Sequence, residues 1–363
     1  MKRLEFLDGL RGLAALYVAM MHAPLIISPK LIIPELIKPV LGYGWTGVEL
    51  FFIVSGFSLT MTMPSHYKSD RPMVSYAISR LSRIAPLFYV LIIHAIAVKW
   101  FLHGETFDVD KIVKSALFVF NMFPADVGGV VGASWTIGTE MLFYAAFPLV
   151  YLVAKDVWRS LAIAIGSIII SAAFFRIMAA INGGPETLFH YSNVSVITHF
   201  STFVFGIAAY HAVNALSAYG QRDSLGHFLT AAGLAGILWL AMNPYALPLH
   251  PGQSPSFFYV LIVVGLGLAP WRIIVNKVTR FYGRICYSVY LWHPPIIFAL
   301  EPLLHKTKTL GYGDGVTLLI CYSIVLPAIT VAGTASYYLI EIPGLQLGQQ
   351  IKKAIGAHRS NGG

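Results

Sequence analysis

The sequence predicts an all-α integral membrane protein, a bundle of about ten transmembrane helices. Of the 363 residues, 57% are hydrophobic and only 11% are charged, and the mean hydropathy is +0.70. This composition is typical of a membrane protein and not of a large soluble domain. The apolar residues also gather into runs of about twenty residues, the length that a helix needs to cross a bilayer.

These apolar runs follow one another along almost the whole chain. We expect membrane-spanning helices at 10–28, 44–63, 83–102, 134–154, 159–181, 194–214, 226–243, 256–271, 285–304 and 315–339. Prolines lie within or at the ends of several runs, which membrane helices tolerate when neighbouring groups satisfy the freed carbonyls.

The first run follows Lys2 and Arg3 and therefore has the outline of a secretory signal peptide. However, it is longer than a signal peptide's apolar region, acidic Glu5 and Asp8 precede it, and no clear small-x-small cleavage site follows. We expect it to be an uncleaved first transmembrane helix.

The loops predict the orientation. With ten spans, most Lys and Arg residues outside the runs fall on the side of the N-terminus, and few fall on the other side. Basic loops face the cytosol, so both termini should be cytosolic.

Two segments lie outside the runs. The connection at about 103–133 should lie on the outer side and contains DKIVKSALFVFNMF, either a re-entrant helix or a helix on the membrane surface. The last residues predict a short amphipathic helix followed by disorder. We therefore divide the chain into a transmembrane domain at 1–344 and a cytosolic tail at 345–363.

The charge and the cysteines exclude two classes of function. The net charge is +9, but the basic residues sit in short loops and form no single patch, so we expect no nucleic-acid partner. Cys286 and Cys321 lie in or beside apolar runs without metal-like spacing. We expect packed thiols and no bound metal.

The first candidate site residues are Arg11 and His22. Eleven positions at 100° each return to nearly the same helix face, and His22 would lie about 16 Å deeper than Arg11. Ionisable side chains at that depth are costly and by default mark a functional cavity. Because imidazole can take up a proton near neutral pH, His22 is a candidate general base.

Arg80 and Arg83 are the second candidate pair. They lie three residues apart, on one helix face at the predicted cytosolic end of the third span. Two guanidinium groups in this place suit phosphate or pyrophosphate, although arginines at cytosolic helix ends also commonly meet lipid headgroups.

Three further polar residues interrupt apolar runs. Ser55 and the adjacent Gly56 allow either a ligand contact or a close approach of two helices. Glu140 lies in the outer half of its span and needs a partner or water, for which His22 and a sugar hydroxyl are candidates. His293 lies beside two prolines, and we expect it to line the acceptor half of a cavity together with Glu140. Trp135 either stacks on a sugar or marks the interface.

Taken together, these segments resemble the membrane acyltransferase-3 family. The matching pieces are LEFLDGLRGLAALYVAMMHA, GVELFFIVSGF, RLSRIAPLFYV, SWTIGTEMLFYAAFPL, YSVYLWHPPI and YYLIEIPG, which occur in the family's order. The resemblance implies a ten-helix bundle in the cytoplasmic (inner) membrane. It also implies transfer of an acyl group, mostly acetyl, from cytosolic acyl-CoA to hydroxyls of extracytoplasmic glycans or small molecules.

The resemblance also implies roles for residues. It makes His22 the catalytic base with Arg11 as its partner, and it assigns Arg80, Arg83 and Ser55 to the acyl-CoA site. No permanently bound cofactor is implied, because acyl-CoA is a co-substrate. No hydrolase-like domain, which accepts the acyl group in some relatives, follows in this sequence. We therefore expect any second transfer to need a separate polysaccharide-assembly protein.

Two other functions remain possible on the sequence alone. One is a transporter in which His22, Glu140 and His293 relay protons, although we detect no repeat and find few intramembrane carboxylates. The other is a catalytically silent scaffold, against which the presence of His22 argues. A direct transfer and a covalent acyl-histidine are both open for the leading function.

Overall fold

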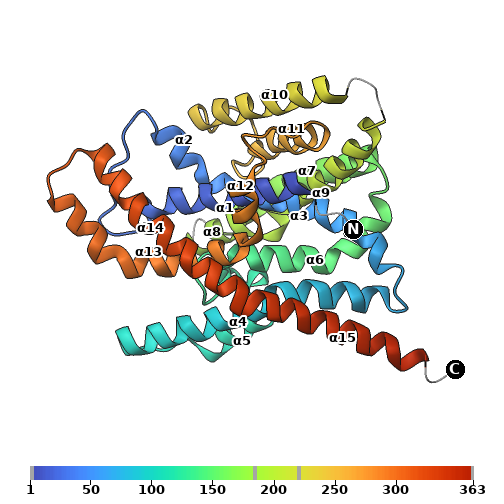
Figure 1. Cartoon of the computed structure of the whole chain (residues 1–363), viewed down its shortest axis with the longest axis horizontal. Coiled ribbons are helices and arrows are strands. Elements are labelled where there is room, and N and C mark those ends of the chain that lie inside the picture. The colour runs from blue at the N-terminus through green and yellow to red at the C-terminus, as the bar shows by residue number, and fades with distance from the viewer. Residues whose placement is uncertain (1–3, 183–185, 219–221, 361–363) are drawn as a thin grey trace.

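The computed structural model describes residues 4–182, 186–218 and 222–360, and within them every regular element is a helix. The predicted all-α fold is therefore confirmed. Figure 1 shows a bundle whose long helices run broadly side by side.

Each predicted span coincides with one long helix. These helices are α1 (Glu5–Leu25), α3 (Gly47–His66), α4 (Pro72–His103), α6 (Trp135–Val153), α7 (Val157–Asn182), α9 (Val196–Leu216), α10 (Arg222–Met242), α11 (Ser254–Leu268), α13 (Cys286–Thr309) and α14 (Asp314–Ser336). Within the described residues, 7 helical stretches are long and apolar enough to cross a membrane, and α11 is apolar but shorter. The chain is thus a multi-pass membrane protein, and the count of ten spans stays a prediction.

Short elements connect and cover the long helices. They are α2 (Lys38–Gly42), α5 (Val109–Ala116), α8 (Glu186–Val194), α12 (Lys277–Arg284), the 3₁₀ turns η1 (Tyr43–Thr46), η2 (Phe120–Met122) and η3 (Pro124–Asp126), and the π-helical turn η4 (Tyr337–Glu341). The predicted surface or re-entrant segment thus contains α5 and two 3₁₀ turns.

The last helix, α15 (Ile342–Ser360), lies where the sequence predicts the helix of the tail. It continues directly from α14 through η4, and it crosses the boundary that we placed after residue 344. The described backbone stays helical as far as Ser360, and the disorder predicted after the helix lies outside the described residues. In Figure 1 α15 ends toward the same end of the bundle at which α1 begins.

The central helix α1 packs against α3, α12 and α13, and α3 in turn packs against α9. Two glycines make the α3–α9 contact very close. A Cβ added at Gly56 would lie 2.0 Å from the carbonyl oxygen of Phe203, and one added at Gly206 would lie 2.0 Å from that of Ile53. Small residues let membrane helices approach in this way, so the close-approach reading of Gly56 fits the structure.

We expect Gly56→Ala to destabilise the protein by about 1–3 kcal/mol, because the new methyl group must push the α9 backbone away. Gly166 in α7 is the matched control, since a Cβ there would meet nothing within 4 Å. Thermal unfolding of the purified protein in detergent measures the effect. Equal midpoints for Gly56→Ala and Gly166→Ala would contradict the assigned packing.

Candidate active site

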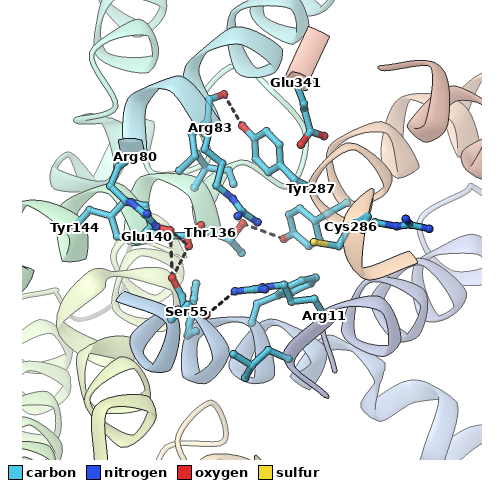
Figure 2. A pocket seen from close by; sticks show the side chains of 18 of the residues that line it. Arg11, Ser55, Arg80, Arg83, Thr136, Glu140, Tyr144, Cys286, Tyr287 and Glu341 are labelled. Carbon is cyan, nitrogen blue, oxygen red and sulfur yellow. Dashed lines mark hydrogen bonds between the residues drawn. The ribbon is translucent and has the colours of Figure 1, made fainter. Parts of the chain in front are cut away.

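The first of two cavities is lined by arginines. This arginine cavity has a volume of about 320 Å³. Its lining includes Arg11 from α1, Arg80 and Arg83 from α4, and Arg284 from the end of α12. In Figure 2 the guanidinium groups of Arg11, Arg80 and Arg83 converge on one space. The structure therefore brings together three predicted site residues from two helices.

Two of these arginines have unused hydrogen-bond donors. The Arg80 guanidinium lies 6.0 Å from the ring centre of Tyr76 and 5.8 Å from that of Tyr144, and its buried Nε has no hydrogen-bond partner. For Arg83, the described residues provide no side-chain hydrogen bond and no ion pair. Guanidinium groups arranged like this are suited to bind an anion such as phosphate.

Arg11 is held more firmly. It donates a hydrogen bond of 2.6 Å to Oγ of Ser58 in α3 and lies 3.4 Å from the carboxylate of Asp8. These contacts orient its guanidinium toward the arginine cavity, as Figure 2 shows.

Glu140 lies in this cavity and not beside His22. It accepts a hydrogen bond of 2.7 Å from Oγ of Ser55 and another from the hydroxyl of Tyr144. Our expectation that Glu140 shares the acceptor half with His293 therefore differs from the structure. The sequence shows how deep Glu140 lies in the membrane, but not which cavity its side chain enters.

Sequence reasoning missed two other residues of the arginine cavity. Glu341 is buried, belongs to the π-helical turn η4 and accepts a hydrogen bond from Ser288. Cys286 is a buried thiol at the start of α13. The signal for Glu341 was present as a lone carboxylate in the apolar segment YYLIEIPG, and π-helical turns are frequent at functional sites.

The second cavity, the histidine cavity, has a volume of about 520 Å³ and lies at the other end of α1. Its lining includes His22, Trp45, Glu49, Trp135, Asn193, His199 and His250. Val48 and Tyr290 line both cavities, so the two spaces adjoin at these side chains.

His22 and His293 form a pair across α1 and α13. Nδ1 of His22 lies 2.8 Å from Nε2 of His293, and the two rings stack with their centres 5.0 Å apart. His293 is completely buried, whereas His22 is partly exposed to the histidine cavity. The structure thus unites two predicted site residues that are 271 positions apart.

The hydrogen bonds determine where the ring protons lie. Nδ1 of His293 contacts the carbonyl oxygen of Tyr290, which can only accept, so this nitrogen carries the proton. In a neutral ring Nε2 of His293 is then an acceptor, and Nδ1 of His22 must donate to it. Nε2 of His22 is left with its lone pair, the form that a general base or nucleophile needs.

A buried pair of Glu49 and His199 lies in the same cavity. Nδ1 of His199 is 3.1 Å from the Glu49 carboxylate, and its Nε2 donates to the carbonyl of Asn193 at 2.9 Å. Neither His199 nor Glu49 is among the candidate site residues predicted from the sequence. No local sequence signal predicted their pairing, because 150 residues separate them.

His250 precedes α11, outside the spanning helices. Its Nδ1 accepts from the backbone N–H of Gly252, and its Nε2 donates to Oδ1 of Asn193. Burial, helped by the nearby His199, lowers the pKa of His250 to about 4. The ring is therefore neutral at physiological pH.

Within the described residues, no group of three or more His, Cys, Asp or Glu side chains could hold a metal ion. The candidate chemistry rests on two features that are present: anion-binding guanidinium groups in one cavity, and an oriented imidazole in the adjoining one.

Comparison with known proteins decides the family. The sequence profile described as an acyltransferase domain matches residues 4–338. The chain belongs to the acyltransferase-3 family. The predicted family is thus confirmed over nearly the whole chain.

Curated relatives are distant. The peptidoglycan O-acetyltransferase OatA of Listeria monocytogenes is 23% identical over 85% of this chain and 51% of its own length. The exopolysaccharide production protein ExoZ of Rhizobium meliloti is 24% identical over 86% of this chain and 93% of its own length.

A putative O-acetyltransferase of Staphylococcus aureus (strain COL) is 24% identical over 94% of this chain and 57% of its own length. The chain thus spans little more than half of the Listeria and Staphylococcus relatives and nearly all of the Rhizobium one. No solved structure matches the chain significantly.

Proposed function

We propose that the protein is a membrane O-acyltransferase that moves an acyl group, most simply acetyl, from acyl-CoA to a hydroxyl of a glycan. The observation that carries this proposal is the junction of the two cavities. A cavity with unused arginine donors adjoins one that holds an imidazole with a free Nε2, and Val48 and Tyr290 line both.

The arginine cavity is the proposed donor site. Coenzyme A carries its phosphates far from the thioester, so a site for it needs cations at one end and room for a thin chain beyond them. Arg80 and Arg83 would hold phosphate, and the thioester would reach toward Val48 and Tyr290. Ser55, Glu140 and Tyr144 offer polar groups along the way.

Transfer would take place at His22. Nε2 of His22 takes the proton of the acceptor hydroxyl, the hydroxyl oxygen attacks the thioester carbonyl, and the carbon–sulfur bond breaks. The proton then passes to the CoA thiolate. In a covalent variant Nε2 itself attacks the carbonyl and afterwards passes the acyl group to the hydroxyl. The free lone pair serves both routes.

The proposed sidedness follows from the basic loops and the bundle. The arginine cavity is formed by the beginnings of α1 and α13 and by Arg80 and Arg83 in the third and fourth turns of α4, whereas the histidine cavity is formed near the last turn of α1 and the first turn of α3. With cytosolic termini, acyl-CoA would enter from the cytosol and the glycan would bind at the outer face of the cytoplasmic membrane. The names of OatA and ExoZ support a polysaccharide acceptor. That separate polysaccharide-assembly proteins take part is our proposal.

The structure does not support the proton path that the transporter alternative needs. It needed His22, Glu140 and His293 in one path, but Glu140 is bonded to Ser55 and Tyr144 in the arginine cavity. The family membership also favours acyl transfer.

A binding and transfer assay tests the proposed function. We expect Arg80→Ala and Arg83→Ala each to weaken binding of radiolabelled acetyl-CoA by about 10-fold to 100-fold, because each removes a charge-assisted contact to phosphate. The maximal rate should change less, because these contacts lie far from the reacting carbonyl.

Arg159→Ala is the matched control, because Arg159 is exposed and pairs only with nearby Asp156 among the described side chains. It should bind acetyl-CoA like the wild type. Unchanged acetyl-CoA affinity in both Arg80→Ala and Arg83→Ala would remove the donor from the arginine cavity.

A further inference from the structure

The histidine cavity differs from the arginine cavity in charge. Among the described residues that line it there is no Lys, no Arg and no Asp, and the one carboxylate is that of Glu49. Glu49 is 1% exposed and paired with His199. The four arginines that line the first cavity have no counterpart here.

The polar groups of the histidine cavity compensate one another. A hydrogen bond between Nδ1 of His199 and the Glu49 carboxylate requires one proton between them. Whether that proton lies on the imidazole or on the carboxylate, the net charge of the pair is zero. His250 uses both ring nitrogens in hydrogen bonds to Gly252 and Asn193 and is neutral. The lining thus has no net cation to meet an anion.

This neutrality limits what can bind. An anionic group placed in the cavity would lose its water without gaining an opposite charge, and it would lie near the Glu49 carboxylate. A hydroxyl group loses much less, because imidazole nitrogen, carboxylate oxygen and backbone carbonyls can all hydrogen-bond to it.

The cavity also has aromatic walls. Trp45, just before α3, and Trp135, at the start of α6, both line it. Trp135 lies against His199, with ring centres 5.3 Å apart, which fixes the position of its indole. Flat apolar surfaces beside a few fixed polar groups fit the C–H face and the hydroxyl rim of a pyranose ring.

We propose that the histidine cavity is the acceptor site and that it selects an uncharged pyranose residue, rejecting sugars that carry a carboxylate or phosphate on the bound ring. This inference deepens the proposed function and rests on it. The bound hydroxyl gives its proton to Nε2 of His22, its oxygen forms the new ester bond, and CoA leaves as the thiol after taking up that proton.

Matched sugar pairs test the selection. Purified protein in nanodiscs receives radiolabelled acetyl-CoA and the p-nitrophenyl glycosides of glucose, galactose or mannose, each against its uronic acid counterpart. The two members of a pair differ only at C6, but there the uronide lacks the hydroxyl as well as carrying the charge. The uncharged methyl ester of each uronide is therefore the matched control, and the effect of charge is the difference between the uronide and its ester. We expect the accepted neutral glycoside to be acetylated at least about 10-fold faster than its uronide, the discrimination that one uncompensated charge produces.

A cavity variant makes the test sharper. Ile26 lines the histidine cavity near the end of α1. Ile26→Lys supplies a cation there, and Ile26→Met changes the side chain without adding charge. We expect Ile26→Lys to raise uronide acetylation relative to the neutral glycoside, and Ile26→Met to keep the wild-type preference.

Three results would count against the inference. Equal use of a uronide and its neutral partner by the wild type would overturn the selection, as would an identical preference in Ile26→Lys and Ile26→Met. If acetyl-CoA binds and is slowly hydrolysed, but saturation-transfer NMR detects none of the neutral glycosides on the protein, the acceptor assignment is wrong while the donor site stands. Failure to bind acetyl-CoA would instead overturn the proposed function.

Discussion

His22→Asn lowers acyl transfer by about 10²–10⁴-fold and leaves acetyl-CoA binding unchanged, if the proposed mechanism is right. The asparagine amide lies near the position of Nδ1, so it can still donate to Nε2 of His293. It has nothing at the position of Nε2, where the wild-type ring offers its lone pair. The substitution therefore removes the base and keeps the hydrogen bond that holds α1 to α13.

Comparison of two variants separates catalysis from structure. If His22 only joins the helices, His22→Ala should lower the thermal midpoint, and His22→Asn should restore both stability and activity. If His22 is the base or the acyl carrier, both variants should be inactive although His22→Asn folds well. Wild-type-like transfer by well-folded His22→Asn would refute the mechanism.

The second large effect is expected at His293, which contacts His22 but does not itself line the histidine cavity. His293→Leu removes the acceptor for Nδ1 of His22, so the His22 ring is free to turn or to change tautomer. Loss of an orienting partner of this kind costs up to about 10⁴ in rate in hydrolytic triads. We expect His293→Leu to lose about 10²–10⁴-fold in maximal rate, with acetyl-CoA affinity unchanged.

His293→Gln is the conservative partner of this test. Its amide oxygen lies near the position of Nε2 and can accept from Nδ1 of His22, so we expect it to recover a large part of the rate. A structural role would affect thermal stability and rate together in both variants. Equal maximal rates for His293→Gln and His293→Leu, at equal stability, would show that the hydrogen bond does not position His22.

Much of the fold follows from hydropathy, since each predicted apolar run became a long helix. Two short elements did not follow: α12 has only 8 residues between two apolar runs, and η4 is continuous with α14 and α15, so neither stands out in the hydropathy of the sequence. The tail was predicted to contain a short amphipathic helix, and α15 lies there as a continuation of α14 through η4. Contacts with α4, including the hydrogen bond from Lys352 to Ser79, hold it in place.

Site residues that lie on the same helix could be predicted together from the sequence. Groupings of residues from different helices could not. The spacing of Arg11 and His22, or of Arg80 and Arg83, is visible within one helix. Which helices face one another is not visible. The sequence therefore predicted Glu140 beside His293, whereas the structure places it with Ser55 and Tyr144 in the arginine cavity.

The pair of Glu49 and His199 escaped prediction for the same reason, because a buried histidine takes its role from a partner far away in the chain. The contact between His22 and His293, and the ring nitrogens that make it, likewise required the structure, because 271 positions separate the two residues.

The central claim is that an acyl group crosses from the arginine cavity to an acceptor at His22, and a sided transfer assay tests it most directly. Proteoliposomes of known orientation enclose an accepted glycoside, and radiolabelled acetyl-CoA is added only outside. We predict that vesicles with the chain termini outward acetylate the enclosed sugar, and that vesicles of the opposite orientation do not. Transfer that occurs only when donor and acceptor are on the same side of the membrane would contradict the account.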